Sequence, residues 1–122
     1  MSELTQHYAD IKPSSQHVQF MLDGVIVANS HQALILKEVS PKGEFPPVWY
    51  IPVGDIIGTY LDKTNLHTFC PIKGEASYYS MNVNGTVYDN IVWYYSDPLP
   101  PVAAIKGYVS FDLSRVSHSI IS

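Results

Sequence analysis

Two dipeptides constrain the fold of this chain most: Asp23-Gly24 and Asn84-Gly85, each between two short apolar runs. A type I′ turn needs a positive φ at both central positions, and Asp or Asn followed by Gly supplies it. The flanking runs are Val18–Leu22 with Val25–Ala28, and Ala76–Val83 with Thr86–Tyr88. We therefore predict two β-hairpins, one in each half of the chain.

The rest of the chain carries the same kind of short apolar run, separated by Pro and Gly at the spacing typical of all-β domains. Further strands are predicted at Ala33–Leu36, Val48–Ile51, Leu66–Cys70, Ile91–Tyr95 and Tyr108–Phe111. Asp55–Leu61 and Pro101–Ile105 are each expected to form one helical turn. We therefore predict a mainly β fold of about eight or nine short, mostly antiparallel strands with one or two single-turn helices.

The 122 residues suffice for one small domain. The strand pattern lies within residues 18–112, which we predict to be the β domain. Residues 1–17 are polar and without a pattern, so we expect a flexible N-terminal lead-in there, and residues 113–122 are expected to be a C-terminal tail.

The composition is poor in charge and rich in tyrosine. Charged residues make up 15%, the formal net charge is −4, and there are nine Tyr. A nucleic-acid surface needs a basic stripe and a membrane span needs about 18 apolar residues in a row, so neither partner is expected. Met1–Asp10 lacks the features of a signal peptide, and a single Cys excludes a disulfide framework. We therefore expect a cytoplasmic protein.

The segment densest in reactive groups runs from Cys70 to Gly74. Pro71 and Gly74 bend the chain, so the thiol of Cys70 and the amine of Lys73 are expected to reach one pocket. A nearby ammonium favours the thiolate, which makes Cys70 and Lys73 candidate catalytic residues. The alternatives are that Cys70 is a small buried hydrophobe and that Lys73 holds an anion.

Aromatic side chains on the central strands are the candidate ligand-binding residues, together with Gly74. They are Tyr50, Tyr78, Trp93 and Tyr94. Tyr and Trp offer an apolar body with one polar tip, as binding pockets require. Because neighbours such as Tyr94 and Tyr95 point to opposite faces of a sheet, at most half of the aromatic set can line one pocket. The alternative is an ordinary core with a Tyr-rich surface.

Asp55 is the third candidate catalytic residue, as an orienting group or proton acceptor, although it suits a helix cap equally well. The five His show no His-x-His or His-x-x-x-His spacing, and the chain has no Asp-x-Asp, Asp-x-Glu or Glu-x-Glu pair. We therefore predict no metal site and no cofactor.

Several strings, in order along the chain, resemble the domain of unknown function 427 family. The hallmark is Cys-Pro-x-Lys-Gly-x-Ala-x-Tyr at Cys70–Tyr78. The other strings are Asp23–Ser30, Pro47–Pro52, Trp93–Tyr95 and Ala104–Phe111. The resemblance implies a small β-tent domain, an architecture in which many relatives bind zinc through two Cys pairs. This chain has one Cys, so that zinc site does not carry over.

Three functions follow, in order of preference. The first is a small-molecule pocket at the Cys70–Gly74 bend, in which Lys73 pairs with an anionic metabolite; whether it is an enzyme stays open. The second is an interaction or homodimerisation module with a Tyr-rich face. The third is nucleotidyl transfer, the automated label that the resembled family bears, although the paired carboxylates which that chemistry needs are missing.

Overall fold

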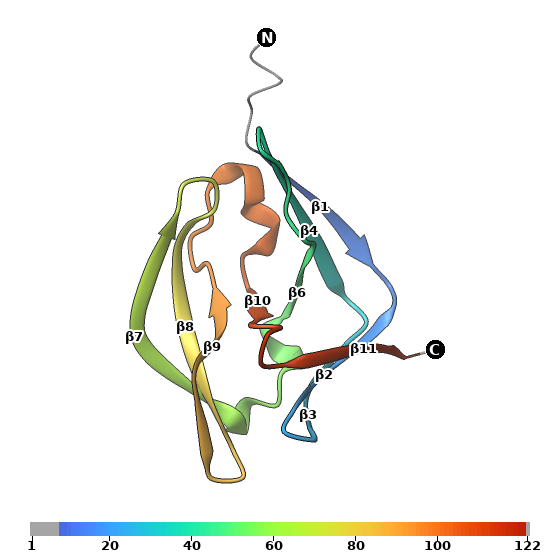
Figure 1. The fold of residues 1–122 in the computed structure, drawn as a ribbon, viewed down its shortest axis with the longest axis vertical. Coiled ribbons are helices and arrows are strands. Elements are labelled where there is room, and N and C mark those ends of the chain that lie inside the picture. The colour runs from blue at the N-terminus through green and yellow to red at the C-terminus, as the bar shows by residue number, and fades with distance from the viewer. Residues whose placement is uncertain (1–7, 122) are drawn as a thin grey trace.

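Strands account for most of residues 8–121, the part of the chain that the computed structural model describes (Figure 1). The described strands are β1 (Tyr8–Ser14), β2 (His17–Leu22), β3 (Val25–Ser30), β4 (Ala33–Ser40), β5 (Gly43–Glu44), β6 (Val48–Pro52), β7 (Leu61–Cys70), β8 (Gly74–Val83), β9 (Thr86–Tyr94), β10 (Tyr108–Phe111) and β11 (Ser117–Ile121). The short 3-10 helices are η2 (Val53–Asp55), η3 (Gly58–Tyr60) and η4 (Pro100–Ile105).

The strands form two antiparallel sheets, which confirms the predicted mainly β class. The larger sheet has the order β1-β4-β6-β10-β9-β8-β7, with β5 paired to β4, and the smaller has the order β11-β2-β3. Figure 1 shows β1, β4 and β6 as one wall and β7, β8 and β9 as the opposite wall, with β10 between them. Helix η4 lies at the end of the molecule where β7 turns into β8.

Both predicted hairpins are confirmed. Asp23 and Gly24 have φ of 53° and 76°, and Asn84 and Gly85 have φ of 53° and 84°. These positive values are those that a type I′ turn requires, and its twist matches that of the paired strands. The first turn joins β2 to β3 and the second joins β8 to β9.

The expected lead-in and tail both need correction, because each contains a strand. β1 lies inside residues 1–17 and pairs with β4 over its whole length, and β11 lies inside residues 113–122 and pairs with β2. Both are edge strands. Every side chain of β11 is exposed, and the inward face of β1 has only Ala9 and Ile11, which is too short an apolar alternation to stand out in a polar segment. Residues 1–7 of the expected lead-in and Ser122 of the tail lie outside the described part.

A further correction concerns β9, which the sequence divided into two strands around Asp89 and Asn90. The structure has one strand from Thr86 to Tyr94, and Asn90 is accommodated in it with a φ of 52°. The register with β8 shifts between Tyr79 and Met81, opposite this point, as expected for a β-bulge. Turn-forming residues thus mark an irregularity inside a strand rather than its end.

Apolar side chains form two separate clusters. The first joins the smaller sheet to the halves of β8 and β9 nearest the turn between them. It includes Phe20 and Phe111, whose rings stack with centroids 4.6 Å apart. The second lies between the two walls, beneath η4, and is centred on Tyr50 and Tyr95. Tyr50 is 1% exposed and Tyr95 6% exposed. The second cluster therefore puts polar hydroxyls inside the domain, where they need partners.

The β8–β9 turn provides a test of the hairpin geometry. Replacing Gly85 by Ala places a Cβ on a residue with a φ of 84°, which costs about 1 kcal/mol because L side chains resist the left-handed region. Gly54→Ala is the matched control, since its new Cβ meets no atom within 4 Å and its φ lies outside that region. Urea denaturation should show a loss of unfolding free energy for the first variant only. Equal values for the two variants would contradict the assigned turn.

Candidate functional site

The turn between β7 and β8 is built from Cys70-Pro71-Ile72-Lys73. The backbone N–H of Lys73 donates to the carbonyl oxygen of Cys70 at 3.2 Å, which closes a four-residue turn with Pro at its favoured second position. Cys70 and Gly74 then pair across the two strands. The bend is therefore tight, and it directs Cys70 and Lys73 toward the second apolar cluster.

Gly74 holds this turn against the segment that precedes η4. Its φ of 108° excludes most L residues, and a Cβ there would lie 3.4 Å from the carbonyl oxygen of Asp97. In addition, the N–H of Leu99 donates to the carbonyl oxygen of Lys73 at 2.9 Å. Gly74, predicted as a ligand-binding residue, thus also permits a close backbone contact that anchors Lys73.

Lys73 bridges the two walls of the larger sheet. Its ammonium Nζ lies 2.8 Å from Oε1 of Glu38 on β4, and the two side chains are only 11% and 15% exposed. By contrast, Lys37 on the same strand pairs with Glu44 at 3.3 Å with both side chains about half exposed, 48% and 60%. Of these two pairs, the Lys73–Glu38 pair is therefore the one whose burial costs desolvation free energy, and only good geometry offsets that cost.

The charge of Lys73 persists despite its burial. Burial lowers the pKa of the ammonium, but the hydrogen bond to Glu38 and the attraction of Tyr50 and Glu38 outweigh it, so the pKa ends above its usual value. Because the folded pKa is raised, the stability from this charge is present throughout neutral pH and is lost only as pH rises beyond the ordinary lysine range. Near neutral pH the site holds a fixed ammonium–carboxylate pair.

Tyr50 and Trp93 provide the aromatic surface beside this pair. Nε1 of Trp93 lies 3.5 Å from the hydroxyl of Tyr50, a long contact for a hydrogen bond. Burial raises the pKa of both Tyr50 and Tyr95, although Trp93 and Lys73 partly offset the effect on Tyr50. Both phenols are therefore neutral hydroxyls near pH 7 and serve as hydrogen-bonding groups rather than charges.

Cys70 and Tyr78 complete the same side of β7 and β8. Both pack against the second apolar cluster, and Cys70 is a free, partly buried thiol. The Tyr78 hydroxyl shares a 2.8 Å hydrogen bond with Oγ1 of Thr68 on the neighbouring strand. The hallmark string therefore delivers a thiol, an ammonium and a phenol to one side of the sheet.

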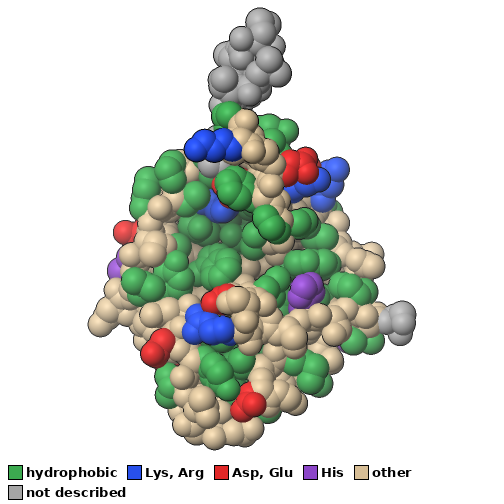
Figure 2. Space-filling view, in the orientation of Figure 1, with side chains coloured by type: hydrophobic (Ala, Val, Ile, Leu, Met, Phe, Trp, Pro, Cys, Tyr) green, Lys and Arg blue, Asp and Glu red, His purple; other side chains and the backbone are tan. Residues whose placement is uncertain are grey.

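A cleft opens beside the Lys73–Glu38 pair. It has a volume of about 350 Å³, and its lining includes Glu38, Val48, Trp93 and Phe111, with Phe45, Pro46 and Pro47 along one side. Figure 2 shows that the viewed face is hollowed near its centre, with mostly hydrophobic side chains in the hollow. An apolar cleft whose one charged lining residue, Glu38, belongs to a buried ion pair has the composition of a small-molecule site.

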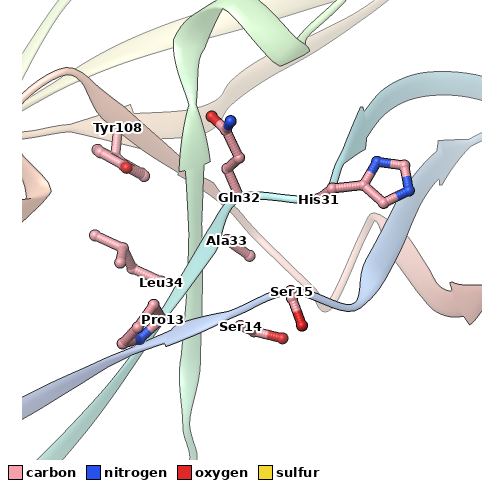
Figure 3. Close-up of a pocket in the computed structure, with 8 residues that line it drawn as sticks. All are labelled: Pro13, Ser14, Ser15, His31, Gln32, Ala33, Leu34 and Tyr108. Carbon is pink, nitrogen blue, oxygen red and sulfur yellow. The ribbon is translucent and has the colours of Figure 1, made fainter.

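A larger cavity lies elsewhere. Its volume is about 560 Å³, and it is bounded by Pro13–Ser15, His31–Leu34 and Tyr108 (Figure 3). Figure 3 shows the His31 ring directed away from Tyr108, and that ring stacks on His17 with centroids 4.3 Å apart. Ser15, His31 and Gln32 are exposed. We consider the smaller cleft the better site, because only it is lined by a member of the buried ion pair.

Two predicted site residues do not join this group. Asp55 is the last residue of η2 and follows the C-terminal end of β6, whereas Glu38 lies near the N-terminal end of that strand. Oδ2 of Asp55 accepts a 2.7 Å hydrogen bond from Ser30. Tyr94 pairs across the strands with Ser77, whereas Trp93 pairs with Tyr78, so Tyr94 faces the other side of the sheet.

Glu38 and Tyr95 belong to the group, but the sequence analysis did not select them. Glu38 follows the buried Leu36 by two residues on a strand, which places an acid on an inward face. Tyr95 follows Trp93 by two residues, so the same period-two rule favoured Tyr95 over Tyr94. Tyr95 was therefore accessible to reasoning from strand periodicity, whereas Glu38 lies beyond the predicted strand Ala33–Leu36, which the structure extends to Ser40.

The chain is a small antiparallel β domain with an apolar cleft whose lining includes Glu38 of a buried ion pair. The sequence matches the family described as domain of unknown function (DUF427) over residues 10–121, so the chain belongs to that family. No curated protein matches the chain. Among residues 8–121, no helix is long and apolar enough to cross a membrane. The same described part contains no group of three or more His, Cys, Asp or Glu arranged to hold a metal ion.

The buried pair can be tested against an exposed one. Lys73→Met leaves the Glu38 carboxylate without its ammonium in a nearly buried place, which should cost about 3 kcal/mol of unfolding free energy. Lys73→Met with Glu38→Gln should recover a large part of that loss, because no uncompensated charge remains. Lys37→Met, in the exposed pair with Glu44, should change stability by less than about 0.5 kcal/mol. Equal losses for the two lysine variants in denaturant titrations would refute the role of the buried pair.

Proposed function

We propose that the cleft beside Trp93 binds a small molecule that has an apolar or aromatic body and an anionic group facing Lys73. The observation that carries this proposal is the Lys73–Glu38 pair, whose 2.8 Å contact is nearly buried and whose Glu38 lines an apolar cleft. A buried charged pair brings no clear gain in stability over apolar packing, which supports a functional reason for it.

The lining of the cleft supports an apolar body for the ligand. Val48 and Phe111 are aliphatic and aromatic walls, and Trp93 offers a large ring with a polar edge. A volume of about 350 Å³ lies at the low end of the range for ligand pockets. The ligand is therefore of metabolite size.

The ammonium supports an anionic group. An ammonium carries three N–H donors, and within residues 8–121 the hydrogen-bond acceptor found for Lys73 is Glu38. Glu38 keeps the amine charged and in place, while the remaining donors are suited to a carboxylate or phosphate oxygen of a ligand. Cys70 and the neutral hydroxyl of Tyr50 lie on the same side and are the groups available for any chemistry.

A thermal-shift screen of metabolites tests this proposal. A ligand that binds only the folded state raises the melting temperature by mass action, so hits should be small carboxylates or phosphates. Each hit is compared with its uncharged amide or alcohol, and with the variants Lys73→Met/Glu38→Gln and Lys42→Gln, the latter altering an exposed lysine. The shift should disappear with the uncharged analogue and in the double variant, and persist in Lys42→Gln. Shifts that survive in the double variant would rule out this site.

A second candidate function is self-association through β7. Within residues 8–121 this strand is the last in its sheet and pairs only with β8, so one of its edges has backbone groups without a strand partner in that part of the chain. Phe69 at its end is 71% exposed and Leu66 is 40% exposed. An exposed edge with an exposed aromatic favours pairing with β7 of a second copy.

Sedimentation velocity over a range of concentrations tests that alternative. Self-association should give a dimer that Phe69→Lys converts to monomer, while the new lysine faces Glu75 in the register and preserves the hairpin. Val87→Lys, which changes an exposed residue on β9, is the control and should remain dimeric. A wild-type chain that stays monomeric at every concentration would exclude the alternative.

A further inference from the structure

A second cleft, lined chiefly by tyrosines, combines residues from both apolar clusters: Tyr79 and Tyr94 pack against the first, and Tyr95 and Tyr108 belong to or pack against the second. Its volume is about 300 Å³. Its lining includes Tyr79, Tyr94, Tyr95, Tyr108, Val53 and Val109. Tyr94, which the sequence analysis selected for a binding site, therefore lies in a cleft, but not in the one beside Lys73.

The aromatic wall of this cleft is preformed. The rings of Tyr79 and Tyr94 stack with centroids 4.9 Å apart and planes 29° apart. Tyr108 is held in the ladder by pairing with Pro52, and the N–H of Val53 donates to the carbonyl oxygen of Gly107 at 3.1 Å. A rigid tyrosine surface loses little entropy when a flat ring packs on it.

One charged residue, Lys106, lines the cleft. It follows η4, where its backbone N–H donates to the carbonyl oxygen of Ala103 at 3.2 Å, and Gly107 with a φ of 84° then turns the chain into β10. Among residues 8–121, no carboxylate lies within ion-pair distance of Lys106. The cleft thus combines flat aromatic walls with an ammonium that has no acidic partner in the described part.

We propose that the tyrosine cleft is a second binding site, which takes a small aromatic carboxylate. The ring of the ligand packs on Tyr79 and Tyr94, and its carboxylate accepts hydrogen bonds from the ammonium of Lys106. The absence of acidic side chains from the lining disfavours a cationic ligand. The volume fits a molecule of one or two rings. This site shares neither Lys73 nor Trp93 with the proposed small-molecule cleft.

A nuclear magnetic resonance titration with 1-naphthoate tests this inference. In ¹⁵N-labelled protein, the amides of Ser96, Gly107 and Val109 should shift with 1-naphthoate. The uncharged 1-naphthalenemethanol should bind roughly tenfold more weakly, because it lacks the charge-assisted hydrogen bond. Lys106→Gln should reduce the affinity for naphthoate to that for the alcohol. Tyr94→Leu should lower the affinity for both compounds.

Two controls keep the outcome clear. Lys42→Gln removes an exposed lysine outside the cleft and should leave the affinity for naphthoate unchanged. Lys73→Met/Glu38→Gln should also leave it unchanged, so a failure of this inference is distinguishable from a failure of the proposed function. Equal affinities for the acid and the alcohol, no effect of Lys106→Gln, or shifts confined to residues around Trp93 would each overturn the second site.

Discussion

The ion pair between Lys73 and Glu38 is the interaction on which the arrangement of the site depends. It joins strand β4 in one wall to the β7–β8 turn in the other, two parts that lie far apart in the strand order of the sheet. Since both side chains are nearly buried, either one without its partner would be strongly unfavourable. The pair therefore couples the separation of the two walls to the electrostatics of the cleft between them.

The backbone around the turn makes this pairing possible. Pro71 favours a tight turn, and Gly74 allows the chain to pass close to Asp97 and Leu99. The turn is consequently held from two sides, by Glu38 through the ammonium and by Leu99 through the backbone. Anchoring a lysine at its backbone as well as at its charge reduces the entropy lost when a ligand binds. In this way the hallmark string produces a preorganised cation.

Most of the fold was predictable from local chemistry, and the failures have a common cause. The turns at Asp23-Gly24 and Asn84-Gly85 followed from the need for positive φ. The edge strand β11 was missed because its pairing with β2, not a buried face, specifies it, and β1 was missed because only Ala9 and Ile11 face inward from it. The pairing of Lys73 with Glu38 spans 35 residues, and no local pattern encodes such a contact. Strand periodicity placed Tyr95 on the face of Trp93, but Glu38 lies beyond the predicted strand Ala33–Leu36, and periodicity gave no means of choosing which strand faces meet.

The alternation of side chains along β9 explains how one short strand serves two chemical environments. Trp93 faces the side of the charged pair, whereas Tyr94 stacks with Tyr79 on the other side. A chain of 122 residues with 15% charged side chains has few ionic groups to distribute. Tyrosine can supply polar groups in their place, because it packs like an apolar ring and still offers a hydroxyl. The high tyrosine content thus suits a thin sheet in which tyrosines pack on both faces and still offer hydroxyl groups.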